Sequence, residues 1–209
     1  MTDAREAVLG RVRRALSGAH RGSPQEVRRD YRTTRPVEDP VGLFCERVAD
    51  YRATVERTSG EGLPAAIAAA ARGAGATRLL TPDGAPQVWS SALGDDFQLV
   101  GADADTAALD QVDAVITTAA VGIATTGTIV LDHGPGQGRR AATLVPDVHV
   151  CVVAERQVVD DVPAALSRLD PARPMTFISG PSATSDIELN RVEGVHGPRK
   201  LHVLVVPED

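Results

Sequence analysis

Three loops in the second half of the sequence combine glycine with hydroxyl or charged side chains, which are residue types that bind anions or transfer protons. The loops cover residues 122–128, 134–140 and 179–188. Each follows a short apolar run, and ligands of open α/β sheets tend to bind beyond the carboxyl ends of strands. The pattern therefore predicts a site for a small anion near these loops.

The first loop, GIATTGT, offers main-chain N–H groups together with threonine hydroxyls. Because glycine lets a ligand approach the backbone closely, Thr125, Gly127 and Thr128 are candidates for anion binding. The loop is not a P-loop, since no Gly-Lys-Ser/Thr sequence follows the glycine. A tight connection between two strands explains the same residues, and the sequence leaves both interpretations open.

The second loop, GPGQGRR, spaces its glycines as G-x-G-x-G. Dinucleotide-binding folds need G-x-G-x-x-G, so NAD binding is disfavoured. Arg139 and Arg140 open a predicted short helix whose dipole favours an anion, and a guanidinium binds carboxylates and phosphates through paired hydrogen bonds. Gly136, Gly138 and Arg139 are therefore candidate anion ligands. A turn with two solvated arginines is the alternative.

The third loop, SGPSATSDIE, carries more hydroxyl and carboxylate groups than one turn or helix cap requires. Ser182 and Thr184 are candidate anion ligands. Asp186 and Glu188 would share one side of an extended chain, which makes them candidates for a catalytic acid and base. His196, between glycines in the sequence GVHGPR, is the third catalytic candidate. A simple helix cap at this loop is the alternative.

Histidines and cysteines follow no recognised metal-binding motif. His133, His149 and His196 accompany acidic residues, but no His-Glu-x-x-His spacing is present, so we assign no metal site and keep a metal-binding module as an alternative. Cys45 and Cys151 lie far apart, which disfavours structural zinc and an iron–sulfur cluster in this chain. Cys151 alternates with valines and is expected to be buried. No Gly-x-Ser-x-Gly motif supports a Ser-His-Asp triad.

Alternating apolar runs and helical stretches predict the elements that hold these loops. From Thr77 onward the strands are expected in RLLTP, QVW, FQLVGA, DAVITTAAVG, TIVLD, HVCVVAE, MTFISG and LHVLVV, and helices in DTAALDQ and DDVPAALSRLD. Continuous apolar strands separated by helices indicate an α/β fold with a largely parallel sheet covered by helices on both faces. Since only 3% of residues are aromatic, the core must consist mainly of Val, Leu, Ala and Ile.

The beginning of the sequence predicts helices and a linker. Val8, Val12 and Leu16 lie on one stripe of an N-terminal helix, and an arginine-rich arm broken by Gly and Pro follows it. The arm is either a solvated connector or a docking segment for an acidic partner. An amphipathic helix is expected over 41–58, followed by an alanine-rich helix that ends at glycine. We therefore divide the chain into an N-terminal helix and arm, residues 1–40, and a single α/β domain, residues 41–209.

Composition limits the possible partners and location. A net charge of −6 argues against a nucleic-acid surface, which needs clustered Lys and Arg. No stretch approaches the ~18 apolar residues that span a bilayer. The first residues lack the charged leader and continuous apolar run of a secretory signal. We therefore expect a cytoplasmic protein without a membrane span.

Three stretches of the sequence together resemble a known family. ATTGTIVLDHGPGQGRRAATLVPDVHVCVV, FISGPSATSDIELNRVEGVHGPRKLHVLVV and the N-terminal AREAVLGRVRRAL are similar to the LUD-domain family, formerly DUF162. The resemblance is dense from Asp113 to the last residue and weaker over 18–110. It implies an α/β domain similar to the NagB/RpiA/CoA-transferase group. It also implies a role, with two partners, in oxidising L-lactate to pyruvate.

The resemblance further implies that iron–sulfur clusters lie in the partner proteins, and the two cysteines of this chain agree with that division. We therefore expect a non-redox subunit with no cofactor of its own, which assembles with iron–sulfur lactate-utilization proteins and binds a small anion. A flavin bound without a recognisable motif stays open. The competing hypothesis is a stand-alone enzyme of the same fold group acting on a sugar phosphate, CoA ester or folate, with Asp186 or Glu188 as its catalytic carboxylate.

Overall fold

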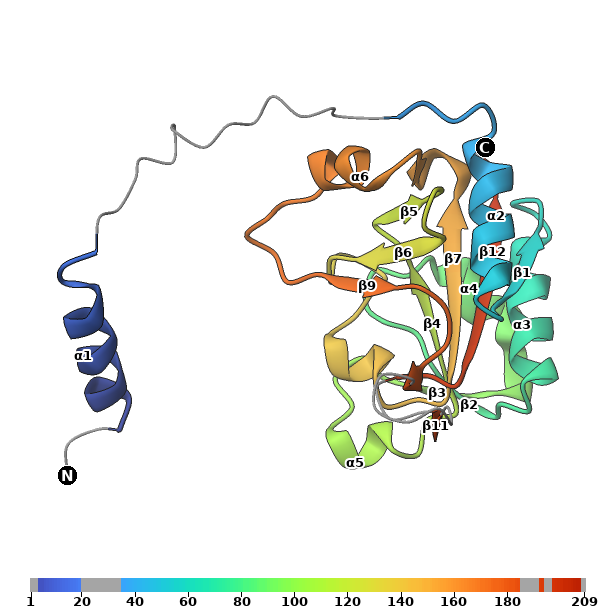
Figure 1. The fold of residues 1–209 in the computed structure, drawn as a ribbon. Helices are drawn as coiled ribbons and strands as arrows, with labels where there is room; N and C mark the ends of the chain where they lie inside the picture. Colours follow the sequence, from blue (N-terminus) through green and yellow to red (C-terminus); the bar gives the residue numbers. More distant parts are fainter. Residues whose placement is uncertain (1–3, 20–34, 185–191, 194–196, 208–209) are drawn as a thin grey trace. The chain divides into compact units, whose positions relative to one another are not determined.

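The computed structural model describes residues 4–19, 35–184, 192–193 and 197–207 (Figure 1). The chain forms two compact units, residues 1–32 and 33–209. The first unit contains α1 (Ala4–Leu16), which confirms the predicted N-terminal helix; none of its residues is buried.

A parallel sheet forms the centre of the second unit. Among the described residues, six strands pair in the order β1-β12-β7-β4-β2-β3, and every neighbouring pair is parallel. This arrangement confirms the predicted α/β fold with a largely parallel sheet. The strands are β1 (Thr54–Arg57), β2 (Arg78–Leu80), β3 (Gln98–Val100), β4 (Ala114–Thr118), β7 (Val148–Ala154) and β12 (Lys200–Val206).

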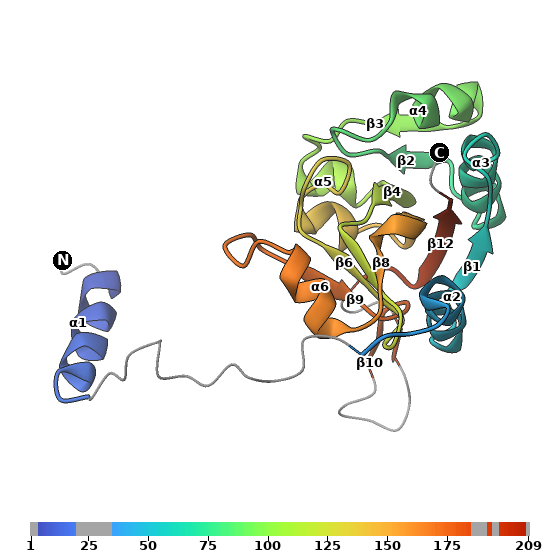
Figure 2. The same cartoon turned by 90° about the horizontal axis from the view of Figure 1, so that it is seen from above.

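Different elements cover the two faces of this sheet (Figure 2). Helices α3 (Leu63–Gly73) and α4 (Gln87–Leu93) pack on one face, against alternate residues of β7 such as Val148 and Val150. Helix α2 (Pro40–Asp50), the short helix α5 (Thr106–Leu109) and a second sheet pack on the other face. Successive side chains of a strand point to opposite faces, so β7 contributes to both cores.

The second sheet is small and mixed. Its described strands follow the order β8-β5-β6-β9, in which β5 pairs with β8 in parallel and β6 pairs antiparallel with β5 and β9. Helix α6 (Val162–Arg168) packs on its outer side, and its inner side lies against the large sheet. The strands are β5 (Val121–Ile123), β6 (Thr128–Leu131), β8 (Val158–Val159) and β9 (Thr176–Ile178).

Shorter elements complete the described part of the chain. Strands β10 (Ala183–Thr184) and β11 (Val192–Glu193) pair antiparallel. Three short 3-10 helices connect longer elements: η2 (Gly94–Asp96), η3 (Arg140–Thr143) and η4 (Glu155–Gln157). Of these, η3 leads toward β7 and brings two polar side chains to the site described below.

Three predicted elements differ from the structure. The run DAVITTAAVG was expected to be a strand, but it is divided between β4 and the start of β5, which lie in different sheets. The run QVW was expected to be a strand, but it begins α4, because Trp89 and Leu93 are one helical turn apart and both are buried on the same side. Residues 41–58 were expected to form one helix. Instead α2 ends at Asp50, Arg52 takes a left-handed conformation with φ 67°, and β1 follows as an edge strand.

Candidate functional site

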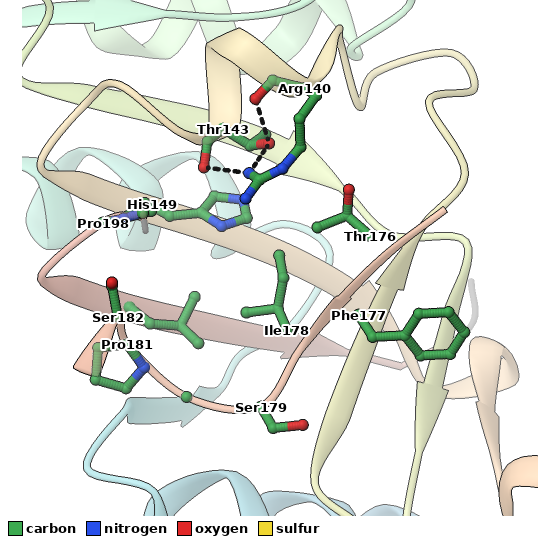
Figure 3. A pocket seen from close by; sticks show the side chains of 13 residues that line it. Arg140, Thr143, His149, Thr176, Phe177, Ile178, Ser179, Pro181, Ser182 and Pro198 are labelled. Atoms are coloured by element: carbon green, nitrogen blue, oxygen red, sulfur yellow. Dashed lines mark hydrogen bonds between the residues drawn. The ribbon is translucent and has the colours of Figure 1, made fainter. Parts of the chain in front are cut away.

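A cavity of about 130 Å³ lies beside the amino-terminal ends of β7 and β12, on the face of the large sheet that meets the second sheet (Figure 3). Residues 176–182 and 197–198 close it. A water molecule takes up about 30 Å³ of the liquid, so the space suits a ligand of a few heavy atoms. The polar side chains that line it are Arg140, Thr143, His149, Thr176, Ser179 and Ser182.

Arg140 brings a cation into this cavity from η3. Its Nη1 donates to the carbonyl oxygen of Thr143 at 3.3 Å and to the Thr143 hydroxyl at 3.4 Å. The Thr143 hydroxyl in turn donates to the Arg140 carbonyl at 3.2 Å, and Thr143 is buried. Figure 3 shows the guanidinium directed toward the ring of His149. The short helix therefore fixes the position of the positive charge.

His149 contributes an uncharged imidazole. It is the second residue of β7 and is fully buried, with Nε2 2.7 Å from the Thr117 hydroxyl of β4. Burial and the positive charge of Arg140 lower the pKa of His149 to about 4. The ring is therefore neutral at physiological pH, and Arg140 supplies the positive charge beside it.

Hydroxyl groups connect the cavity wall to the second sheet. The Thr128 hydroxyl of β6 lies 2.8 Å from the hydroxyls of both Ser179 and Thr126. On the other side of the cavity, the N–H of Ser182 donates to the carbonyl of Pro198 at 2.8 Å. These bonds hold the loop that follows β9 against the segment that enters β12.

His133 links the cavity to the glycine-rich loop. Its Nδ1 lies 2.8 Å from the carbonyl oxygen of Gly138, and its Nε2 lies 3.3 Å from the hydroxyl of Thr176. A carbonyl only accepts, so Nδ1 carries the hydrogen, and in the neutral ring Nε2 accepts from Thr176. The glycine-rich loop therefore supports one wall of the cavity through a side chain.

Together these groups suit a small anion. A guanidinium forms charge-assisted hydrogen bonds to carboxylate or phosphate, which are about twice as strong as bonds between neutral groups. Hydroxyls donate additional bonds in any direction that rotation of the O–H allows. A neutral histidine beside the arginine adds a polar group without a second charge. The arrangement therefore favours a ligand with one anionic group and further polar atoms.

No residue of the first predicted loop lines this cavity, and Thr128 only contacts the lining residue Ser179. It forms the turn between β5 and β6, where the N–H of Thr125 donates to the carbonyl of Asp160 at 3.1 Å. Gly127 has φ 57°, and a Cβ there would lie 2.6 Å from the backbone of Arg47. Close packing against α2 therefore accounts for this glycine.

The second predicted loop lies next to the carboxyl-terminal ends of β2 and β4. The cavity, in contrast, lies beside the amino-terminal ends of β7 and β12. The N–H of Gly136 donates to the carbonyl of Asp83 at 2.7 Å, and Gly138 has φ 70° and packs on Pro82. The guanidinium of Arg139 donates to the carbonyl of Ala104. The structure thus places Gly136, Gly138 and Arg139 outside the cavity, and the neighbouring Arg140 lines it instead.

The third predicted loop contributes most. Ser182 lines the cavity, and Ser179 at the start of the loop does so as well. The backbone of Thr184 belongs to β10 and pairs with β11. Asp186, Glu188 and His196 lie outside the described residues, so their catalytic roles stay predictions.

Several lining residues were not among the predicted ligands. Thr143 and Thr176 have ordinary sequence surroundings, and nothing in their spacing points to a shared site, whereas Ser179 begins the third predicted loop but was not chosen as a ligand. His149 offered a signal, because a histidine inside the run VHVCVV interrupts a strand that is otherwise apolar and buried. Buried polar residues of this kind need a hydrogen-bond partner, so a histidine in such a strand indicates a polar contact inside the protein.

Comparison with known proteins identifies the family. The sequence profile of the LUD domain matches residues 101–206, which include every residue of the cavity. A relative named lactate utilization protein C, from Deinococcus radiodurans, is 42% identical over 98% of this chain and 96% of its own length. The chain belongs to the LUD-domain family. The predicted resemblance is thereby confirmed.

Other LUD-domain relatives agree with this result. The crystal structure of a DUF162 family protein from Deinococcus radiodurans has a TM-score of 0.68 and 39% identity, over 82% of this chain and 99% of that one. A protein from Geobacillus sp., also named lactate utilization protein C, is 34% identical over 47% of this chain and 44% of its own length. The likeness therefore extends from sequence to fold.

No helix in the described ranges is both long enough and apolar enough to cross a membrane. Within the same ranges, no three His, Cys, Asp or Glu side chains gather closely enough to hold a metal ion.

Proposed function

We propose that this LUD-domain protein acts in lactate utilization and that its cavity binds a small carboxylate, with L-lactate and pyruvate as the expected ligands. The observation that carries the proposal is the placement of Arg140 in a small cavity lined by hydroxyls. The names of the Deinococcus and Geobacillus relatives support the assignment to lactate metabolism.

The chemistry of the cavity fits a 2-hydroxy or 2-oxo acid. Arg140 would bind the carboxylate, since a guanidinium matches its two oxygens. The hydroxyls of Ser179 and Ser182 would bond to the neighbouring oxygen of the ligand, and Ile178 and Leu201 would contact its methyl group. Because His149 is neutral, it does not compete with Arg140 for the carboxylate by charge.

We further propose that the protein is a non-redox subunit that works in the cytoplasm with iron–sulfur partner proteins. Lactate oxidation releases an electron pair, which the clusters of the partners would accept. Such a cluster is usually held by four cysteine thiolates, whereas this chain contains two cysteines. Burial raises the pKa of the Cys151 thiol to about 12, and it also raises the pKa of the half-buried Cys45. Both cysteines therefore favour the thiol form.

Calorimetric titration of the purified chain with L-lactate and with pyruvate tests the binding proposal. We expect saturable binding that weakens at least about tenfold in Arg140→Ala, because a charged hydrogen bond contributes about 1.5–3 kcal/mol. Arg139→Ala is the matched control, since its side chain donates to the Ala104 carbonyl instead. Absence of saturable binding, or equal losses in the two variants, would overturn the ligand assignment.

The role in lactate utilization needs a separate measurement. In cells that lack this chain, we expect growth on L-lactate as carbon source to fail and to return with the wild-type gene. Purification of the tagged chain without oxygen should then recover iron–sulfur proteins whose lactate oxidation stops when the chain is omitted. Undiminished growth of the deletion strain would refute the assignment to lactate metabolism, whatever the titration shows.

A further inference from the structure

A second cavity, of about 470 Å³, lies on the opposite face of the large sheet. We call it the α3 groove, because it runs between the C-terminal half of α3 and the first residues of β1 and β12. Its lining includes Arg52, Glu56, Arg199, Lys200 and His202, together with alanines and a glycine of α3. No residue of the proposed lactate site except Leu201 contributes to it.

Three cationic side chains line the α3 groove although the protein carries a net charge of −6. Arg52, Arg199 and Lys200 are all exposed, while Glu56 is the one acidic side chain in the described lining. Lys200 Nζ donates to the carbonyl of Ala74 at 3.2 Å, and Arg199 pairs with Asp147, with one contact at 2.8 Å. These contacts hold two of the cations in place at the edge of the groove.

Arg52 adds a cation to the groove, but its own backbone conformation is strained. Its φ of 67° lies in the left-handed region, which costs an ordinary residue of order 1–3 kcal/mol. Glycine would adopt the same backbone conformation without strain. Within the described ranges its side chain has no hydrogen bond or ion pair. An arginine at a position that suits glycine is consistent with a use for its charge.

The side of the α3 groove that α3 forms carries only small, uncharged residues. Ala69, Ala70 and Gly73 face it from α3, and a Cβ added to Gly73 would meet no atom within 4 Å. Small side chains on the helix therefore leave open space above β12. This space would receive the uncharged part of a ligand.

His202 supplies an unsatisfied polar atom at the base of the α3 groove. Its Nε2 is buried, has no hydrogen-bond partner in the described part of the chain, and lies 3.8 Å from the nearer carboxylate oxygen of Glu56. An unmade hydrogen bond on a buried nitrogen destabilises the protein. A small movement of the ring toward an incoming polar group would remove that deficit.

We infer that the α3 groove is a second binding site, for an organic anion whose charged group meets Arg52 and Lys200 and whose apolar part lies over Ala69, Ala70 and Gly73. Carboxylates and phosphate monoesters share this chemistry. The inference is independent of the proposed lactate site, because it uses other side chains on the other face of the sheet.

Calorimetric titration of the full chain with three probes tests the inference. Phenyl phosphate and benzoate combine an anionic group with an apolar ring, whereas inorganic phosphate has the charge alone. We expect at least one aromatic probe to bind saturably and at least tenfold more tightly than inorganic phosphate. The better of the two aromatic probes identifies the preferred anionic group. No saturable binding of either aromatic probe would overturn the inference.

Four variants locate the bound probe. Gly73→Leu fills the groove and should weaken binding at least tenfold, while Ala65→Leu, an exposed position of the same helix outside the lining, should leave it unchanged. Arg52→Gly removes a cation and relieves the strained backbone, so affinity should fall about tenfold while the melting temperature stays equal or rises. Wild-type affinity in Gly73→Leu or Arg52→Gly would overturn the inference. Arg140→Ala should bind the probe normally, and a loss there would instead assign the probe to the lactate site and refute a second one.

Discussion

The two central strands of the large sheet show different chemistry on their two faces. Toward α3 and α4, β4 presents Ala114 and Ile116 and β7 presents three valines, all in one apolar cluster. On the opposite face, the same strands present Thr117, His149 and Cys151 beside two valines, Val115 and Val153. Both faces are buried to the same degree, so exposure does not explain the contrast.

This contrast indicates that the two faces of the sheet have different roles. A buried polar group costs free energy unless it is hydrogen-bonded, and even then it contributes little net stability. The face toward the helices avoids this cost at the central strands. The face toward the second sheet accepts it and carries one wall of the cavity. We therefore expect substitutions on the helix face to act on stability, and those on the other face to act on pH response or binding.

The largest effect is expected on the helix face. Leu204 of β12 is fully buried in the cluster under α3, so Leu204→Ala should lower the free energy of unfolding by about 2–5 kcal/mol. Leu99→Ala on edge strand β3 is the control, because Leu99 is 42% exposed and should change stability by roughly 0.5 kcal/mol or less. Urea denaturation measures both. Similar losses in the two variants would contradict the central role of this face.

A pH-dependent effect is expected on the opposite face. The folded pKa of His149 is about 4, against 6.5 for an ordinary histidine, so between these values the unfolded state binds the extra proton. Stability due to the neutral ring is therefore complete above about pH 6.5 and is lost as the pH falls toward 4. The loss amounts to roughly 3 kcal/mol. Urea denaturation from pH 7 to 4 should show a steeper decline in wild type than in His149→Gln, and parallel curves would disprove the assignment.

The smallest effect is expected from Cys151→Val, on the same face. The thiol is fully buried and accepts one weak contact from the Thr117 hydroxyl at 3.6 Å. A buried thiol packs like a small apolar group, so a valine of similar size should change the free energy of unfolding by less than about 1.5 kcal/mol. Urea denaturation at neutral pH measures it. A loss as large as that of Leu204→Ala would show that the face toward the second sheet also depends on close packing.

Much of the fold was predictable because its strands are continuous apolar runs. The run from Val148 to Ala154 identifies a buried strand by composition alone. Which strands pair with one another was harder to predict from the sequence. TIVLD and MTFISG are strands as predicted, but they pair antiparallel in the second sheet, and local composition does not specify the partner. The short run QVW was ambiguous because three residues cannot distinguish a period of 2 from one of 3.6.

The site was predictable only in part, because distant segments assemble it. The many hydroxyl side chains of the third loop predicted Ser182, which lines the cavity. The glycine next to threonines in the first loop predicted Thr128, which supports the cavity wall through Ser179. The choice between Arg139 and Arg140 could not be made from the sequence. Arg139 precedes η3 and Arg140 is its first residue, and their side chains point in different directions, so one reaches the Ala104 carbonyl and the other the cavity.

The position of Trp89 gives the two faces separate spectroscopic signatures. It is the single tryptophan of the sequence, and it is 3% exposed in the cluster between α3, α4 and the large sheet. Its fluorescence therefore reports the environment of the helix face, whereas far-ultraviolet circular dichroism averages over all elements. If the two signals change together during denaturation, the faces unfold as one cooperative unit. If the dichroism changes first, the second sheet separates while the helix face remains folded.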